Sequence, residues 1–349
     1  MTNLRRKPFI HALLVFVLSF NILITTAFAS EQLVMVVAVT RHGDRTPFDQ
    51  IVNSPIDWKN ESAELTPTGM NQLFSVGSQY HQNYMENQRL LPEKFNNKYI
   101  AVYSSDTNRT MMSAESLLYG LYPLGYGSLL PDGQAALPKR FQPVPIRMIA
   151  ADSSLIITPY TDYLRIMKEN VYSQPEWQKT EQQNQANFAR WTKILGNNIT
   201  GLNDVMTVGD VLLVRSKNNI PLPAGLTDSD QAQILKLTSW ALAYEYKTKK
   251  VSSICGAELL QRIGNDINTK IANQNDRRFV YYSGHDLTIL PLMTLMNHPL
   301  SQAPGYASHI EFEVYQDDAK NYIVRLVYNN AEVARYPLAD FNKLVASAK

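Results

Sequence analysis

The segment Gln32–Val39 (QLVMVVAV) limits the fold of this 349-residue chain more than any other stretch. It is a continuous, valine-rich apolar run, which is typical of a strand that is covered on both faces in a parallel sheet. Residues 65–85 then carry apolar side chains at helical spacing, with Thr66 as a candidate cap and Pro67 in the first turn. Because a strand followed by a helix begins an α/β pattern, we expect a mostly parallel central sheet with helices on both faces.

Two later apolar runs, residues 99–105 and 278–283, repeat this pattern, since a helical stretch follows each of them. Residues 152–271 lie between these runs and are polar and mainly helical, which predicts a smaller helical cap inserted into the sheet domain. We therefore expect an α/β core made of residues 30–151 and 272–349. Alternating segments near the C-terminus predict antiparallel strands at an edge of the sheet.

Residues 1–29 have the organisation of a secretory signal peptide. Basic residues at Arg5–Lys7 precede an apolar run at 13–24, and small residues at Ala27–Ala29 provide a cleavage site. The alternative is an uncleaved membrane anchor, but the apolar run is short for a full span and polar residues interrupt it. We expect cleavage near Ala29 and an exported protein, periplasmic or secreted, without a stable membrane anchor.

The net charge of the chain argues against one class of function, nucleic-acid binding. The chain has 33 basic and 31 acidic residues, and loss of residues 1–29 removes three basic residues and no acidic one, which leaves a net charge of −1. A near-neutral chain lacks the basic excess of a nucleic-acid-binding protein.

Cys255 is the only cysteine, so no intrachain disulfide can form. No histidine lies near Cys255 in the sequence, so we interpret it as a packed apolar residue rather than a nucleophile.

Polar side chains follow three of the predicted strands at the point where each strand ends. They are Arg41, His42, Asp44 and Arg45 after the first strand, Arg109 after the second, and His285 and Asp286 after the third. Open α/β sheets bind their ligands beyond the carboxyl ends of the strands. We therefore infer that these side chains converge on one pocket.

Arginine and histidine side chains in one pocket point to phosphoryl chemistry. Guanidinium groups match phosphate oxygens in pairs and stabilise the charge on them during transfer. His42 lies beside Gly43, where an anion can approach closely, and the neighbouring arginines favour the neutral, nucleophilic imidazole. Departure of an alcohol then needs a proton donor, and Asp286 suits this role if it is protonated. These two requirements together predict an acidic pH optimum.

The segment RHGDRTP (Arg41–Pro47) resembles the RHGxRxP signature of the histidine acid phosphatases. YYSGHD (Tyr281–Asp286) is similar to the second signature of that family, and shorter similar segments follow the family order along most of the chain. The resemblance implies a phosphorylated nucleophile at His42 and a general acid at Asp286, without a metal or an organic cofactor. It also implies four phosphate ligands: Arg41, Arg45, Arg109 and His285.

The resemblance does not name a substrate, and a pocket that holds the phosphoryl group alone accepts many small-molecule phosphate monoesters. Phe48 and Trp58, in the loop after the first signature, are candidate cleft residues because binding residues concentrate on such loops. Asp44 is a third candidate, either near the substrate or orienting Arg45. Relatives are often dimers, and the predicted C-terminal edge strands leave a homodimer open.

Four alternative functions remain at this point, the last of them a phosphotransferase. The first is a periplasmic phosphate- or anion-binding protein without turnover, although a pure binder has no use for Asp286 beside its anion. The second is a phytase-like inositol phosphate phosphatase, in which an apolar residue more often stands at the position of Asp44. The third is a metal-dependent hydrolase, which the surrounding arginines disfavour because they would repel a divalent cation. A phosphotransferase of the mutase branch would normally lack Arg45–Pro47.

Overall fold

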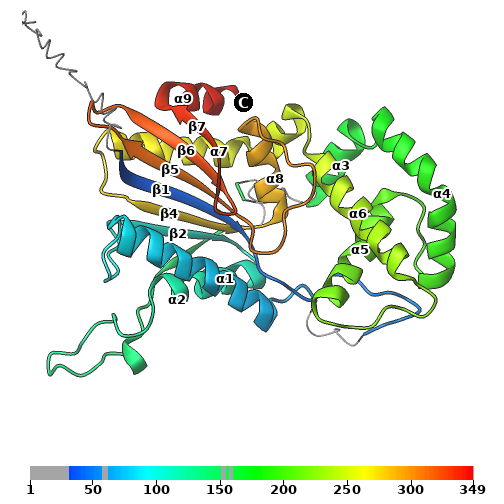
Figure 1. Ribbon diagram of the computed structural model, residues 1–349, viewed down its shortest axis with the longest axis horizontal. Helices are drawn as coiled ribbons and strands as arrows, with labels where there is room; N and C mark the ends of the chain where they lie inside the picture. The colour runs from blue at the N-terminus through cyan, green and yellow to red at the C-terminus, as the bar shows by residue number, and fades with distance from the viewer. Residues whose placement is uncertain (1–30, 57–61, 151–154, 157–159, 349) are drawn as a thin grey trace, which may run out of the picture.

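A seven-stranded sheet runs through the larger part of the molecule (Figure 1). The computed structural model describes residues 31–56, 62–150, 155–156 and 160–348. Its strands are β1 (Gln32–Arg41), β2 (Ile100–Ser105), β3 (Ile146–Ile149), β4 (Phe279–Gly284), β5 (His309–Gln316), β6 (Tyr322–Tyr328) and β7 (Ala331–Pro337). They lie in the order β3-β2-β4-β1-β5-β6-β7.

The sheet has a parallel half and an antiparallel half. Strands β1, β2, β3 and β4 pair in parallel, whereas β5, β6 and β7 continue the sheet from β1 in antiparallel pairs. This arrangement confirms the predicted mostly parallel centre and the antiparallel C-terminal edge. The run that opens the chain becomes β1, in the middle of the sheet, where Val36–Val39 are fully buried.

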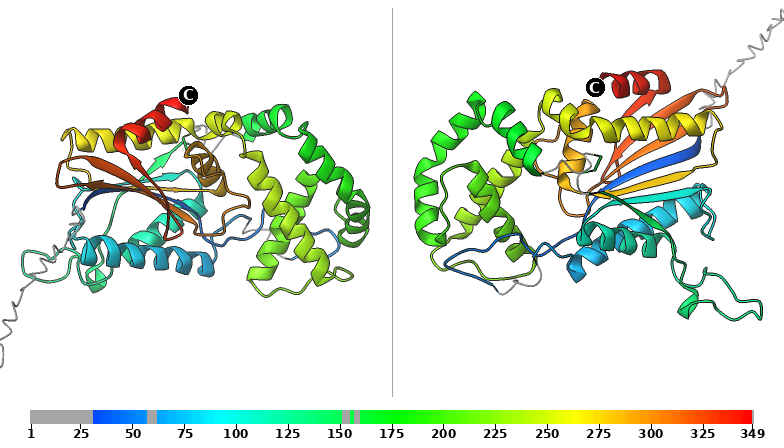
Figure 2. Two further views of the ribbon diagram at one scale, coloured as in Figure 1. Left: turned by 45° about the horizontal axis from the view of Figure 1, so that its top comes forward. Right: turned by 180° about the vertical axis from the view of Figure 1, so that it is seen from behind.

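Helices cover both faces of the sheet, as predicted (Figure 2). One layer contains α1 (Pro67–Tyr80) and α2 (Asn108–Leu121), and the opposite layer contains α7 (Lys249–Ile271), α8 (Asp286–Leu295) and α9 (Leu338–Ser347). Successive residues of β1 face the two layers: Val36 and Ala38 pack with α1 and α2, and Val37 and Val39 pack with the others. The apolar run is continuous because both faces of β1 are buried.

Helix α1 begins as its sequence predicts. Thr66 caps it by accepting a hydrogen bond from the Gly69 amide at 3.1 Å, and Pro67 stands in the first turn, where no amide hydrogen is needed. The helix continues into a π-helical turn, η1 (His81–Asn87). A short 3₁₀ turn, η2 (Pro138–Arg140), lies in the long connection between α2 and β3.

Four helices form a cap beyond the carboxyl ends of the parallel strands (Figure 1). They are α3 (Tyr160–Asn170), α4 (Pro175–Leu195), α5 (Leu202–Lys217) and α6 (Asp228–Glu245). Their apolar side chains form a separate core around Trp177, Phe188 and Trp191. The loop after β1 crosses to this cap, since Ile51 is buried in the cap core and the Asn53 amide donates to the Leu195 carbonyl at 2.9 Å.

Helix α7 lies inside the range 152–271 predicted for the cap, but it does not pack with the cap alone. Helix α7 starts beside the cap core with Val251 and Cys255, but Leu260, Ile263 and Ile267 pack beneath the sheet. The helix therefore belongs mainly to the sheet domain, because its long apolar face turns toward β1 and α9 rather than toward the cap.

Two sequence predictions lie outside the described residues, namely the signal peptide at 1–29 and the cleft residue Trp58. Across the part of the chain that is described, no helix is both long enough and apolar enough to cross a membrane.

Candidate active site

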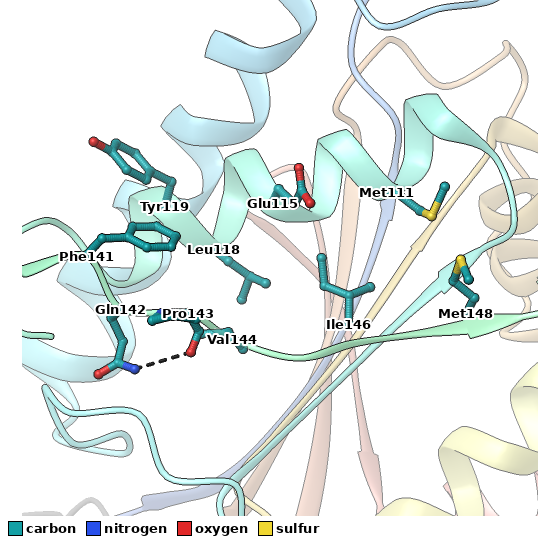
Figure 3. Close-up of a pocket in the computed structure, with 10 residues that line it drawn as sticks. All are labelled: Met111, Glu115, Leu118, Tyr119, Phe141, Gln142, Pro143, Val144, Ile146 and Met148. Atoms are coloured by element: carbon teal, nitrogen blue, oxygen red, sulfur yellow. Dashed lines mark hydrogen bonds between the residues drawn. The ribbon is translucent and has the colours of Figure 1, made fainter. Parts of the chain in front are cut away.

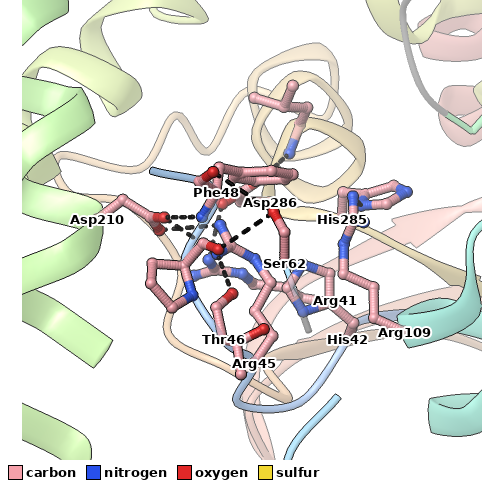
Figure 4. Close-up of polar contacts among 12 residues, drawn as sticks. Arg41, His42, Arg45, Thr46, Phe48, Ser62, Arg109, Asp210, His285 and Asp286 are labelled. Atoms are coloured by element: carbon pink, nitrogen blue, oxygen red, sulfur yellow. Dashed lines mark hydrogen bonds and ion pairs between the residues drawn. The ribbon is translucent and has the colours of Figure 1, made fainter. Parts of the chain in front are cut away.

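The carboxyl ends of β1, β2 and β4 bring the predicted site residues together next to the cap (Figure 4). Arg41 pairs in register with Gly284, and the His42 amide donates to the Gly284 carbonyl at 2.9 Å. This pairing places the His42 ring 5.5 Å from the His285 ring, measured between centroids. Two signatures that lie far apart in the sequence thus meet at adjacent strands.

His42 is held in one tautomer. Its Nδ1 lies 2.8 Å from the Gly43 carbonyl oxygen, which only accepts hydrogen bonds, so Nδ1 carries the proton and Nε2 keeps its lone pair. Burial, with Arg41 and the other nearby cations, lowers the pKa of His42 well below 6.5. The imidazole is therefore neutral and nucleophilic even in mild acid.

Gly43 is required by close packing against α1. A Cβ at this position would lie 2.3 Å from the Gly69 carbonyl oxygen, a distance that no side chain tolerates. The glycine thus allows the loop that carries His42 to pack directly on the N-terminus of α1.

Three guanidinium groups surround the neutral histidines. Arg41 and Arg45 are each only 5% exposed. The Nε atoms of Arg41, Arg45 and Arg109 are buried and have no hydrogen-bond partner among the described residues. Buried donors without partners are rare and costly, and an anion would supply acceptors for all three. The arrangement is suited to binding a tetrahedral anion.

Arg45 is anchored by Asp210, a residue of α5 that sequence reasoning missed. Asp210 accepts hydrogen bonds from both terminal nitrogens of Arg45, at 3.0 and 2.8 Å, as Figure 4 shows. The ring of Phe48 lies over the Arg45 guanidinium at 4.1 Å and over that of Arg109 at 5.2 Å. Phe48 is 54% exposed, so it covers the arginines from the solvent side.

His285 caps α8 and contacts the end of β2. Its Nε2 lies 2.8 Å from the Ser105 hydroxyl, and its Nδ1 lies 3.4 Å from a terminal nitrogen of Arg109. Because Arg109 can only donate, Nδ1 is the acceptor and Nε2 carries the proton. Burial and Arg109 lower the pKa of His285 to about 3, so this ring is also neutral.

Asp286 begins α8 and forms an ion pair with Arg41 at 2.9 Å. Burial alone would raise the pKa of Asp286, but Arg41, His285 and Arg45 outweigh it and lower the pKa below 3.8. Asp286 is therefore a carboxylate beside Arg41. The sequence analysis required a protonated Asp286 for the role of general acid, and it did not foresee this ion pair.

Asp44 does not line an open cleft. It is fully buried, and it accepts hydrogen bonds from the Thr66 hydroxyl at 2.6 Å and the Asn218 amide at 3.3 Å. It does not orient Arg45 either, since Asp210 does so. Asp44 instead connects the start of α1 to the end of α5, a structural position that its place in the signature did not reveal.

A separate apolar cavity of about 620 Å³ lies between α2 and the edge strand β3 (Figure 3). Met111, Leu118, Tyr119, Ile146 and Met148 are among its lining residues, and no signature residue reaches it. The polar chemistry is therefore at the strand ends and not in this cavity. Within the described ranges, no group of three or more histidine, cysteine, aspartate or glutamate side chains has the arrangement of a metal site.

Known proteins resemble this chain in sequence over most of its length, and a solved structure resembles it in fold. It is 29% identical over 345 residues to lysosomal acid phosphatase of Bos taurus, covering 94% of this chain and 78% of that protein. It is 27% identical over 321 residues to prostatic acid phosphatase of Rattus norvegicus, covering 88% and 82%. A phytase structure from Hafnia alvei has a similar fold, with a TM-score of 0.67, 16% identity, and coverage of 93% and 98%.

The family model described as histidine phosphatase superfamily (branch 2) matches residues 32–329. This range includes both signatures, the strands β1 to β6 and the whole cap, and it ends before β7. The chain therefore belongs to the histidine phosphatase superfamily (branch 2), and it is a phosphomonoester hydrolase of the histidine acid phosphatase type.

Proposed function

We propose that this enzyme hydrolyses phosphate monoesters through a phosphohistidine on His42, with Asp286 transferring the protons. The observation that carries the proposal is the arrangement of donors around His42. Among the described residues, three buried guanidinium Nε atoms have no hydrogen-bond partner, and the ring nitrogen of His42 that is not bonded to the Gly43 carbonyl is Nε2. A phosphoryl group bound by the arginines would have a neutral nucleophile beside its phosphorus atom.

In the first step, Nε2 of His42 attacks phosphorus and the bond from phosphorus to the ester oxygen breaks. The arginines stabilise the charge on the equatorial oxygens of the transferring group. Asp286 gives its proton to the ester oxygen, and the alcohol leaves. The products of this step are phosphohistidine, the alcohol and an Asp286 carboxylate.

The substrate can supply the proton that Asp286 needs. Phosphate monoesters have a second pKa of about 6, so in mild acid they arrive as monoanions that still carry one proton. A bound phosphoryl group also places negative charge near Asp286, which raises the pKa of this carboxyl. Asp286 then takes up the proton and passes it to the leaving oxygen. This route accounts for activity in acid without a protonated Asp286 beforehand.

In the second step, water attacks phosphorus and the bond to Nε2 breaks. The Asp286 carboxylate accepts a proton from the water and passes it to the phosphate, which leaves as the monoanion, so Asp286 is again a carboxylate. His42 regains its neutral form because its proton stays on Nδ1, where it is donated to the Gly43 carbonyl. No cofactor takes part in either step.

The test is to trap the intermediate by rapid acid-free quenching with a monoester radiolabelled at phosphorus. We expect acid-labile, base-stable label on the wild-type protein. His42→Ala should carry no label and lose turnover, while His81→Ala, a histidine on η1 whose Nδ1 lies 2.9 Å from the Leu121 carbonyl, should keep both. Turnover by folded His42→Ala at the wild-type rate would refute the proposal.

We also propose that the enzyme is exported after cleavage near Ala29. The basic, apolar and small-residue regions of residues 1–29 support this proposal. Sequencing the N-terminus of the protein recovered from the producing cells is the direct test. A chain that begins near Ser30 would support export, whereas an intact residue 1–29 segment on the mature enzyme would contradict it.

A further inference from the structure

Asp210 is the one cap carboxylate that reaches a guanidinium group of the phosphate site in the described structure. Besides its two hydrogen bonds from Arg45, Asp210 accepts a third from the Phe48 amide at 3.3 Å. It lies in α5, outside both signatures, 165 positions after Arg45. A single side chain thus joins the cap, an arginine of the site and the loop that covers this arginine.

The contact sets the direction in which Arg45 can donate. The two terminal nitrogens of Arg45 are held by Asp210, and one of them also donates to the Thr46 carbonyl at 3.0 Å. Its Nε is buried and has no partner in the described parts of the chain, like the Nε atoms of Arg41 and Arg109. A paired guanidinium of this kind is preorganised, so it does not have to be ordered again when a phosphoryl group binds.

Asp210 also lies on the solvent side of the arginines. Its side chain is 21% exposed, whereas that of Arg45 is 6% exposed. The neighbouring Phe48 is an exposed apolar ring over Arg45 and Arg109. The described groups on the solvent side of Arg45 therefore include an aromatic face and a carboxylate.

The Phe48 ring and the Asp210 carboxylate favour some leaving groups over others. A neutral, aromatic leaving group can pack on Phe48 and is not repelled by Asp210. A leaving group with further phosphates brings negative charge toward the Asp210 carboxylate, and Arg45 is already paired there. The charges at this opening therefore favour substrates with one phosphate.

We propose that Asp210 is a positioning residue for Arg45 and the element that makes the enzyme prefer monophosphates with uncharged leaving groups over polyphosphorylated substrates. The proposal rests on the function proposed above, because it assumes that the arginines hold the phosphoryl group under attack. It adds the chemical class of the leaving group, which the signatures leave open.

The test compares two substrates on the same protein samples: para-nitrophenyl phosphate and inositol hexakisphosphate. The quantity measured is the ratio of kcat/KM for the first substrate to kcat/KM for the second. For Asp210→Asn, which removes the charge and keeps the size, we expect this ratio to fall about tenfold, as for one partly screened charge pair. The KM for para-nitrophenyl phosphate should rise, because Arg45 is less well ordered.

Two further variants isolate the charge of Asp210. Asp210→Glu restores the carboxylate, so it should keep the wild-type ratio even if its overall activity is lower. Asp228→Asn removes an exposed carboxylate elsewhere on the cap, at the start of α6, and should also keep the ratio. A misfolded fraction cancels in the ratio, so a purely structural role of Asp210 would leave it unchanged.

An unchanged or raised ratio in Asp210→Asn would overturn the proposal, and so would an equal fall in Asp228→Asn. The result is separable from the proposed mechanism. If His42→Ala is inactive and the ratio does not move, only the role of Asp210 is refuted. If His42→Ala turns over normally, the proposed mechanism is refuted whatever the ratio does.

Discussion

Strand β1 lies between two buried polar clusters that are built in opposite ways. On the β4 side is the arginine site, with Arg41, Arg45 and Arg109 around the neutral histidines. On the β5 side is a glutamate cluster, which consists of Glu311, Glu313, Tyr80, Tyr84 and Arg325. In the glutamate cluster most polar atoms have partners: Tyr84 donates to Glu313 at 2.8 Å, Arg325 Nε donates to it at 2.6 Å, and Tyr80 donates to Glu311.

The difference lies in which atoms remain without partners. As far as the structure describes the chain, three cationic donors of the arginine site lack acceptors, and all of them belong to side chains that meet at one place. By the same measure, one oxygen of Glu311 in the glutamate cluster lacks a donor, while the tyrosines and Arg325 satisfy its neighbours. Buried polar groups that satisfy one another stabilise a fold, whereas a set of unsatisfied donors of one charge is suited to a ligand of opposite charge.

Removal of Arg109 should show the largest contrast between the two clusters. Burial and Arg45 lower the pKa of Arg109 to about 10, so the charge of this side chain does not stabilise the folded protein. We expect Arg109→Ala to reduce kcat/KM about 10²- to 10³-fold, the usual effect of losing one donor to transferring charge. Its free energy of unfolding should stay the same or rise, because the variant removes a buried cation whose charged form is disfavoured by folding. Steady-state kinetics and urea unfolding measure the two effects.

Arg325→Ala is the matched control for this prediction. Arg325 is ion-paired with Glu313, and its removal leaves a buried carboxylate without its cation. This variant should lose stability and keep its kcat/KM per folded molecule. If Arg109→Ala instead destabilised the protein as much as Arg325→Ala does, the contrast between the clusters would not hold.

The pH dependence of stability should differ between the wild type and Glu311→Gln. Burial raises the pKa of Glu311 to about 7, against contributions from His309 and Tyr80 that lower it. Between the unfolded value of 4.5 and the folded value, the folded protein binds a proton that the unfolded chain releases. This contribution is complete below the unfolded pKa, and it is lost as the pH rises through the folded pKa.

Glutamine does not titrate, so the variant lacks this dependence. From about pH 5 to about pH 8, the wild type should lose on the order of 3 kcal/mol of unfolding free energy relative to Glu311→Gln. Urea unfolding of both proteins at both pH values gives this difference, and the groups that titrate identically in both proteins cancel. A difference that does not change with pH would mean that Glu311 is ionised throughout.

Sequence analysis predicted the site residues that lie in contiguous signatures at the ends of strands. Arg41, His42 and Arg45 follow one apolar run, His285 and Asp286 follow another, and parallel strands bring such ends to one edge of the sheet. The same reasoning placed the first helix, because a cap and a proline mark its start. Local pattern was sufficient in both cases.

The missed features depend on contacts that no local pattern records. Nothing near Asp210 in the sequence marks it as a site residue, because only the folded cap brings it to Arg45. Likewise, the ion pair of Asp286 with Arg41 joins the ends of two strands. The hydrogen bond that Asp44 accepts from Asn218 could not be foreseen for the same reason, since Asn218 follows α5 in the cap. Apolar spacing showed that residues 249–271 form a helix, but it could not show which of two cores this helix faces.

The smallest predicted effect compares two buried tyrosines on the same face of the sheet. Tyr84 donates its hydroxyl hydrogen to Glu313 at 2.8 Å, so Tyr84→Phe leaves that carboxylate oxygen short of a donor. We expect a loss of about 1 to 3 kcal/mol in the free energy of unfolding and no change in kcat/KM. Tyr122 packs in the same apolar core, but its buried hydroxyl has no partner among the described residues.

Tyr122→Phe therefore removes a polar atom that makes no hydrogen bond there, and it should leave the free energy of unfolding within about 0.5 kcal/mol of the wild type or raise it. Both variants delete one oxygen atom from a buried ring, so the difference between them isolates the hydrogen bond to Glu313. Equal losses in the two variants would show that the glutamate cluster is stabilised by packing of its rings and not by its paired polar atoms. The contrast between the glutamate cluster and the arginine site would then rest only on the unpaired donors of the arginines.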